Sequence, residues 1–161
     1  MIIQKTREEI ELMRESALIV SKTLGMIARE IKPGVTTLYL DKLAEEFIRD
    51  HGAVPSFLGL YGFPNSLCMS PNSQVVHGIP NTIPLESGDV ISVDCGAFKN
   101  GFHGDHAYSF EIGEVAPETK KLLQVTKESL YVGISEYILS NFSTCKIFYH
   151  SYITFCTVKH I

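Results

Sequence analysis

Two aspartates, Asp94 and Asp105, stand in stretches of sequence that otherwise have the composition of β-strands. Aspartate is disfavoured in strands, so its presence in both stretches calls for a chemical reason. The Asn100-Gly101 pair between them predicts a two-residue hairpin loop. With that loop, Asp105 lies opposite Gly96 and diagonally from Asp94, on one face of the hairpin. Carboxylates at that range repel each other, so either one binds a proton with a raised pKa or a cation lies between them.

Two interpretations of this pair are open from the residues alone. In the first, the carboxylates bind a metal ion, and the glycines around the turn leave space for a ligand. In the second, both aspartates face solvent near a turn. His103 shares the face of Asp105, whereas His106 lies on the opposite face of the strand. The two histidines therefore do not form a chelating pair if the strand is regular.

A third candidate residue is His77, in the stretch VVHGIP. An imidazole there could bind a metal ion, act as an acid or base, or hydrogen-bond a substrate. The alternative is a histidine that belongs to the core. The sequence contains no Gly-rich phosphate loop, no GxSxG and no HExxH. The common signatures of nucleotide binding, serine hydrolysis and helix-borne zinc proteolysis are therefore excluded.

Periodicity predicts the helices that must support these residues. The stretch 6–9, TREE, is a capping box at the start of a helix that the stretch 32–34, KPG, ends. The apolar stripe of that helix is predicted to consist of Ile10, Met13, Ala17, Val20, Leu24, Ile27 and Ile31. A second helix is predicted from about Thr37 to Asp50. Its apolar residues are Leu40, Leu43, Ala44, Phe47 and Ile48.

Strands are predicted after the two helices. Short apolar stretches predict them at 67–70, 75–77 and 90–95, and the hairpin returns as a strand at 103–112. Pro117 is placed at the first position of a third helix, which runs to about Val132. This order of helices, strands and helix predicts an α+β fold with a mainly antiparallel sheet.

Length and composition are those of one globular domain: 161 residues, of which 45% are hydrophobic and 20% charged. The net charge of -4 argues against a protein that binds a nucleic-acid backbone. No apolar run is long enough to span a membrane, and the charged N-terminus does not have the pattern of a signal peptide. We therefore expect a soluble cytoplasmic protein with free thiols and without nucleic-acid or membrane partners.

The composition changes abruptly at about residue 136. All 18 Asp and Glu residues lie within residues 1–136, and residues 137–161 contain no acid, glycine or proline. Their aromatic residues are Tyr137, Phe142, Phe148, Tyr149, Tyr152 and Phe155. One explanation is a terminal hydrophobic helix or strand pair. The other is a segment that is not the evolved C-terminus of the domain, for example an out-of-frame extension.

Three stretches together resemble the type I methionine aminopeptidases, which are pita-bread metallopeptidases. They are KPGVTTLYLDKLAEEFIRDHGAVPSF, GFPNSLCMSPNSQVVHGIP and GDVISVDCGAFKNGFHGDHAYSFEIG. The resemblance runs from about residue 3 to 136. It implies that residues 1–136 are the N-terminal half of a pita-bread fold, followed by an atypical aromatic tail at 137–161. It also implies a monomeric cytosolic enzyme that removes the initiator methionine from nascent polypeptides, with the ribosome as a further partner.

The resemblance assigns roles to particular residues. It implies a site for two divalent ions (cobalt, manganese, iron or zinc), with Asp94 bound to one ion and Asp105 bridging both. It implies that His77 is the catalytic residue that hydrogen-bonds the substrate near the scissile amide. The residues implied to border the methionine pocket are Phe57, Leu60, Phe63 and Cys68, together with His77. In some members of the family, the backbone loop near Asn72 holds a monovalent cation.

The sequence departs from the family in its last part. The family completes its site from a second half that brings further His and Glu ligands. Here the family pattern ends near residues 134–136, and the tail has no Asp or Glu side chain. We therefore expect a truncated methionine aminopeptidase with little or no activity. The alternative, from another functional class, is a non-catalytic pita-bread module that binds peptides or ribosomes.

Overall fold

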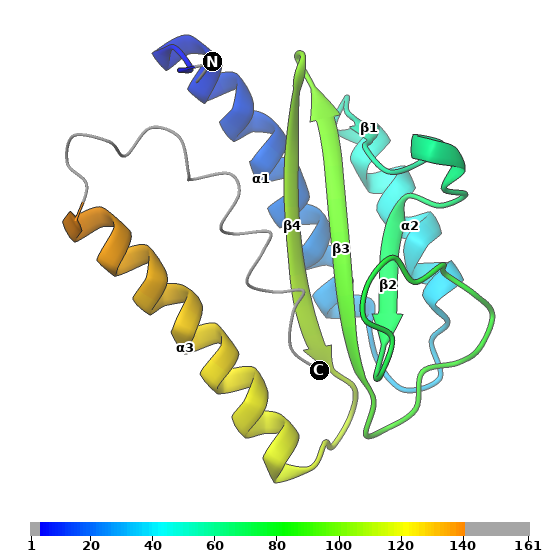
Figure 1. Ribbon diagram of the computed structural model, residues 1–161. Coiled ribbons are helices and arrows are strands. Elements are labelled where there is room, and N and C mark those ends of the chain that lie inside the picture. Colours follow the sequence, from blue (N-terminus) through cyan, green and yellow to red (C-terminus); the bar gives the residue numbers. More distant parts are fainter. Residues whose placement is uncertain (1–3, 141–161) are drawn as a thin grey trace.

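The computed structural model describes residues 4–140 of the chain. These residues form three long helices and an antiparallel sheet (Figure 1). In chain order the elements are α1 (Arg7–Glu30), α2 (Thr37–Asp50), β1 (Val54–Pro55), the 3-10 turn η1 (Leu60–Gly62), β2 (Leu67–Pro71), β3 (Val90–Lys99), β4 (Phe102–Glu111) and α3 (Pro117–Ser140). The predicted α+β class is confirmed. Of the predicted tail, residues 137–140 continue α3, and residues 141–161 lie outside the described residues.

Strand β3 is the centre of the sheet. β4 pairs with it antiparallel over its whole length, from Val90 opposite Glu111 to Lys99 opposite Phe102. β2 pairs with residues 91–95 of β3, and β1 pairs with residues 97–98. Because β4 occupies one edge of β3 completely, β1 and β2 lie one after the other along the other edge. Strand β3 carries Asp94. It is hydrogen-bonded on one edge to the segment that follows α2 and on the other edge to β4, which carries Asp105.

Helices α1 and α2 cover one face of the sheet, and in Figure 1 they lie behind the strands. The side chains of β3 that pack into the core under these helices are Ile91, Val93, Cys95 and Ala97. Because side chains alternate along a strand, Ser92, Asp94 and Gly96 belong to the opposite face, which we call the far face. The helices thus leave the far face available for the candidate site.

The buried face of α1 differs from the predicted stripe. Ile10 is 42% exposed and Ala17 is also exposed, whereas Ser16 is fully buried. The Ser16 hydroxyl donates to the backbone oxygen of Phe102 at 2.9 Å and of Lys99 at 3.3 Å. The prediction was wrong here because it ranked residues by hydrophobicity. A small hydroxyl side chain fits closer to the strands than a large apolar one, and it satisfies its own hydrogen bond there.

Residues 75–77, predicted as a strand, form an exposed loop. The outer edge of β2 is occupied by a later residue, Gly78. The backbone N–H of Met69 donates to the oxygen of Gly78 at 2.8 Å, and the N–H of Gly78 donates to the Ser70 hydroxyl at 3.0 Å. Apolar composition alone therefore misassigned this segment, because Gly78, and not residues 75–77, is bonded to the edge of β2.

Helix α3 extends to Ser140, beyond the predicted end at Val132. It lies to one side of β4 in Figure 1, and no side chain among residues 117–136 is buried. The Lys127 ammonium lies 6.0 Å from the centre of the Tyr108 ring. None of the helices within residues 4–140 combines the length and the apolar composition needed to cross a bilayer.

Gly104 is the point at which α1 approaches β4 too closely for a side chain. A Cβ atom there would lie 2.5 Å from the backbone nitrogen of Ala17 and 2.6 Å from the carbonyl carbon of Ser16. We expect Gly104→Ala to lower the free energy of unfolding by about 1–3 kcal/mol, because the helix and the strand must separate. Urea unfolding followed by circular dichroism measures this change.

The matched control is Gly25→Ala in α1, the helix that Gly104 approaches. Gly25 is exposed, and a Cβ atom there would meet nothing within 4 Å. Alanine favours a helix over glycine, so this variant should gain roughly 0.5–1 kcal/mol. If Gly104→Ala unfolds at the same urea concentration as the parent, the close approach of α1 to β4 is wrong.

Candidate metal centre

The hairpin between β3 and β4 has the predicted turn and the predicted register. Asn100 and Gly101 have φ angles of 52° and 85°, as a two-residue hairpin loop requires. Asp105 lies opposite Gly96, and Asp94 lies opposite Ala107. The two aspartates are therefore diagonal neighbours on the far face of adjacent strands.

The two carboxyl groups interact directly. Burial, the negative charge of Asp105 and a hydrogen bond between the two side chains raise the pKa of Asp94 to about 7, whereas the backbone N–H of Cys95 acts in the opposite direction. A hydrogen bond between two carboxyl groups requires a proton on one of them. Without a cation, the pair therefore holds a proton well above the pH at which an ordinary aspartate loses it.

This arrangement fits a divalent cation. Oδ1 of Asp94 is buried and has no hydrogen-bond partner within the part of the chain that the structure describes. A cation would replace the missing donor and remove the repulsion between the carboxylates. Carboxylate oxygens are also suitable ligands for divalent ions. Among residues 4–140, however, no group of three or more His, Cys, Asp or Glu side chains is placed to hold a metal ion.

The loop after β1 covers the far face beside the carboxyl pair. A Cβ atom on Gly96 would lie 2.8 Å from Cε1 of Phe57 and 2.8 Å from Cβ of Ser56. The Ser56 hydroxyl lies 2.9 Å from Nδ1 of His103, which connects the loop to β4. Phe57, one of the predicted pocket residues, therefore lies over the residue that faces Asp105.

Cys68 lies directly opposite Asp94 in the pairing of β2 with β3. Its side chain is buried, and it is a free thiol. Burial, followed by the negative charges of Asp94, Asp105 and Asp41, raises the pKa of the thiol to about 12. At neutral pH, Cys68 therefore places a protonated, weakly polar thiol beside the carboxyl pair.

Two more of the predicted pocket residues, Leu60 and Phe63, belong to the loop around η1. Leu60 begins η1 and is 52% exposed, whereas Phe63 follows η1 and is half-buried. The loop closes on itself through the backbone, because the N–H of Gly59 donates to the oxygen of Phe63 at 2.8 Å. The structure thus places Phe57 and Cys68 next to the carboxyl pair and leaves Leu60 largely in solvent.

His77 lies at the outer edge of β2, across that strand from Asp94. The residue after it, Gly78, is hydrogen-bonded to β2, and a Cβ atom on Gly78 would collide with the backbone oxygen of Met69. His77 itself is exposed and has a φ of 57°. A left-handed conformation costs a non-glycine residue about 1–3 kcal/mol and is common at functional sites. The exposure of His77 argues against a place in the core, and its role in the site stays a prediction.

Two further residues have their side chains engaged elsewhere. His106 lies on the helix-covered face opposite Cys95, as predicted, and burial lowers its pKa. Asn72 donates from Nδ2 to Asp89 at 2.8 Å and accepts at Oδ1 from the N–H of Val90 at 3.0 Å. A monovalent cation near Asn72 would therefore have to be held by backbone oxygens and stays a prediction.

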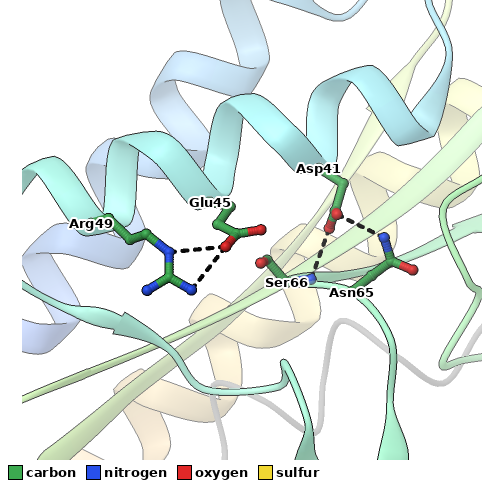
Figure 2. Close-up of polar contacts among 5 residues, drawn as sticks. All are labelled: Asp41, Glu45, Arg49, Asn65 and Ser66. Carbon is green, nitrogen blue, oxygen red and sulfur yellow. Dashed lines mark hydrogen bonds and ion pairs between the residues drawn. The ribbon is translucent and has the colours of Figure 1, made fainter.

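Sequence reasoning missed Asp41, which connects α2 to the end of the pocket loop. Its carboxylate accepts hydrogen bonds from residues 65–67, as Figure 2 shows for Asn65 and Ser66. The residue is 3% exposed. A signal was available in the sequence, because Asp41 lies on the core-facing stripe of a helix. A carboxylate at such a position needs partners that satisfy it.

Comparisons with known proteins identify the family and the fold. The model of metallopeptidase family M24 matches residues 11–150. The chain is similar to methionine aminopeptidases from Clostridium perfringens (49% identical over 141 residues) and Clostridium acetobutylicum (51% over 142 residues), covering 88% of this chain and 57% of each relative. The crystal structure of methionine aminopeptidase from Rickettsia prowazekii has a TM-score of 0.80 and 38% identity, over 81% of this chain and 53% of that one.

The matched regions cover most of this chain but only part of its relatives. The chain spans just over half the length of the relatives that it matches. The range matched by the family model also continues past residue 136, where the composition changes. The predicted division of the chain at residue 136 stays a prediction.

The raised pKa of Asp94 makes the stability of the metal-free chain depend on pH. The folded-state pKa of about 7 exceeds the ordinary value of 3.8, so the stabilisation is complete below about pH 4 and is lost as the pH rises through 7. An asparagine resembles the protonated carboxyl at every pH. We therefore expect Asp94→Asn to match the parent near pH 4 and to exceed its unfolding free energy by about 1–3 kcal/mol near pH 8.

Urea unfolding in the presence of a chelator, at both pH values, measures this difference. Asp50→Asn removes an exposed carboxylate at the end of α2 and serves as the control. An Asp94→Asn variant with the same stability difference from the parent at both pH values would show that the carboxyl pair does not hold the proton.

Proposed function

The chain belongs to metallopeptidase family M24, and on that premise we propose that its site is that of a methionyl aminopeptidase. This activity removes the initiator methionine from the N-termini of nascent polypeptides in the cytoplasm, at the ribosome, by metal-dependent hydrolysis. The observation that carries the proposal is the interaction of the half-buried carboxyl groups of Asp94 and Asp105 on the far face. The similarity to two methionine aminopeptidases supports the substrate class.

Each site residue then has a role. Asp94 would bind one divalent ion, and Asp105, from the neighbouring strand, would bridge two. When bound, ions such as cobalt, manganese, iron or zinc activate water for attack and polarise the peptide carbonyl. Asp94 must release its proton to bind a metal, so metal binding is favoured as the pH rises. His77 would donate a hydrogen bond to the substrate near the scissile amide.

The methionine side chain would lie between Phe57 and Cys68, with Leu60 and Phe63 at the border of the pocket. An aromatic ring and a neutral thiol suit an unbranched thioether, since sulfur makes favourable contacts with aromatic rings. The neutral state of Cys68 also matters. A thiolate opposite Asp94 would add a third negative charge to a site in which two carboxylates already repel each other.

A second candidate function is peptide binding without hydrolysis. One observation favours it: residues 4–140 contain no cluster of three or more His, Cys, Asp or Glu side chains that could hold an ion. Two carboxylates alone hold a divalent ion weakly, because metal affinity depends on the number of charged ligands. In this form the far face would bind an N-terminal methionine and leave the peptide bond intact.

Titration with Mn²⁺ tests the shared metal site. At about pH 8, where the carboxyl pair is largely ionised, we expect Asp94→Asn and Asp105→Asn each to weaken Mn²⁺ binding by more than about tenfold. Isothermal titration calorimetry of the full chain gives the affinity. Asp50→Asn is the matched control and should bind Mn²⁺ like the parent. Unchanged binding in both site variants would remove the basis of the proposal.

A peptidase assay tests the reaction. The full chain is incubated with Met-Ala-Ser and Mn²⁺ or Co²⁺, and free methionine is measured by liquid chromatography. We expect release that is far slower than with the Clostridium perfringens enzyme and is abolished by chelator or by Asp94→Asn. The reason is that the described residues supply two carboxylate ligands.

Leu-Ala-Ser is the control substrate and should not be cleaved, since a branched side chain does not match the pocket. Binding of Met-Ala-Ser without release is the result expected for the second candidate. Release that persists in the presence of chelator would contradict metal-dependent hydrolysis.

A further inference from the structure

We propose that Asp41 is a positioning residue, which sets the place of the pocket loop, residues 56–66, relative to the carboxyl pair. The identity of this loop as the border of a methionine pocket rests on the proposed function. The mechanical part of the inference, that one side chain of α2 holds the end of the loop, rests on contacts alone.

One carboxylate holds the junction between the pocket loop and β2. Oδ1 of Asp41 accepts from the backbone N–H of Ser66 at 3.0 Å and of Leu67 at 2.8 Å. Oδ2 accepts from the side-chain amide of Asn65 at 2.8 Å (Figure 2). The three donors belong to consecutive residues, and Leu67 is the first residue of β2. Three bonds to one rigid group define both the position and the direction in which the chain enters β2.

The other end of the loop is attached to the sheet. The backbone N–H of Ser56 donates to the oxygen of Gly96 at 3.0 Å, and its hydroxyl lies 2.9 Å from Nδ1 of His103. Between its ends the loop bonds to itself, through Leu60 N–H to Phe57 oxygen at 3.0 Å. The loop therefore has two anchors, one on the hairpin at Ser56 and one on α2 at Asp41.

The burial of Asp41 shows that its hydrogen bonds are needed. Its desolvation raises its pKa, and the bonds from Asn65, Leu67 and Ser66 oppose that effect. A buried carboxylate without these donors would be strongly destabilising, and the two backbone N–H groups without an acceptor would be too. The side chain and the junction are therefore held in one mutual arrangement.

This junction lies next to the candidate site. Cys68 follows Leu67 in β2 and faces Asp94, and the negative charge of Asp41 contributes to the raised pKa of the Cys68 thiol. A shift of the junction moves Cys68 along β3 and moves the loop that places Phe57 over Gly96. Asp41 thus acts on the pocket through the residues that it holds, and it need not touch a substrate.

Hydrogen exchange of the full chain, followed by mass spectrometry, tests the positioning role. In Asp41→Ala we expect exchange in residues 56–68 to be about tenfold faster or more, because the second anchor is lost. Exchange in the hairpin, residues 90–111, should not change. The matched control is Glu45→Ala, which removes an ion pair with Arg49 (2.8 Å) on the same helix without touching the loop (Figure 2). It should leave both regions as in the parent.

A second variant keeps the test decisive if Asp41→Ala does not fold. In Asp41→Asn, the Oδ1 atom still accepts from the two backbone N–H groups. The side-chain amide of Asn65 can rotate so that its oxygen accepts from the NH2 group introduced at position 41. We expect a smaller increase in exchange, confined to residues 56–68. An unchanged loop, or an increase that is equal in the loop and the hairpin, overturns the inference in either variant.

Ligand binding separates this inference from the proposed function. With L-methionine and Mn²⁺ as probes, Asp41→Ala should weaken methionine binding about tenfold while Mn²⁺ affinity stays within about twofold. An equal loss of both affinities would mean general destabilisation and would overturn the positioning role. If the parent chain binds no methionine but exchange is still faster in the loop alone, the methionine pocket is wrong and the role of Asp41 stands.

Discussion

The register of the β3–β4 hairpin is the constraint on which the rest of this structure depends. It places Gly96 opposite Asp105 and thereby brings two carboxyl groups to the same face of adjacent strands. A slip of one residue would turn Asp105 toward the helices, because side chains alternate along a strand. The hairpin turn and α1 both oppose such a slip. The turn requires a left-handed pair of residues, and the Ser16 hydroxyl bonds to backbone oxygens on both sides of the turn.

The far face is then assembled from segments that are distant in the sequence. Gly78, which follows His77, is bonded to the outer edge of β2, β2 contributes Cys68, and β3 and β4 contribute the aspartates. Each segment has a separate attachment, so the site is held by several independent sets of hydrogen bonds. The pocket loop is attached to the hairpin at Ser56, and its second anchor is a single carboxylate on α2.

The electrostatics of the carboxyl pair connects folding to ligand binding. Two half-buried carboxylates in direct interaction cannot both be ionised at low cost, so the pair binds either a proton or a cation. Metal binding to such a pair releases the proton and adds to the stability of the folded chain. Asp94 and Asp105 would therefore both lower the stability of the metal-free chain and bind the metal, a combination that is common at functional sites. This balance is a property of the described half-site, whatever length of protein completes it.

The sequence by itself determined the features that depend on neighbouring residues. The capping box at Thr6, the Asn-Gly turn and the period-two alternation were enough to predict the helices, the hairpin and the shared face of Asp94 and Asp105. The family resemblance added the roles of His77 and the pocket residues, which local patterns do not contain. The tertiary structure alone decided which side of α1 is buried, that residues 75–77 form a loop, and that Asp41 holds the start of β2. The reason is physical: each of these depends on hydrogen-bond partners or a strand edge supplied by a distant part of the chain, and hydrophobicity along the sequence carries no record of such partners.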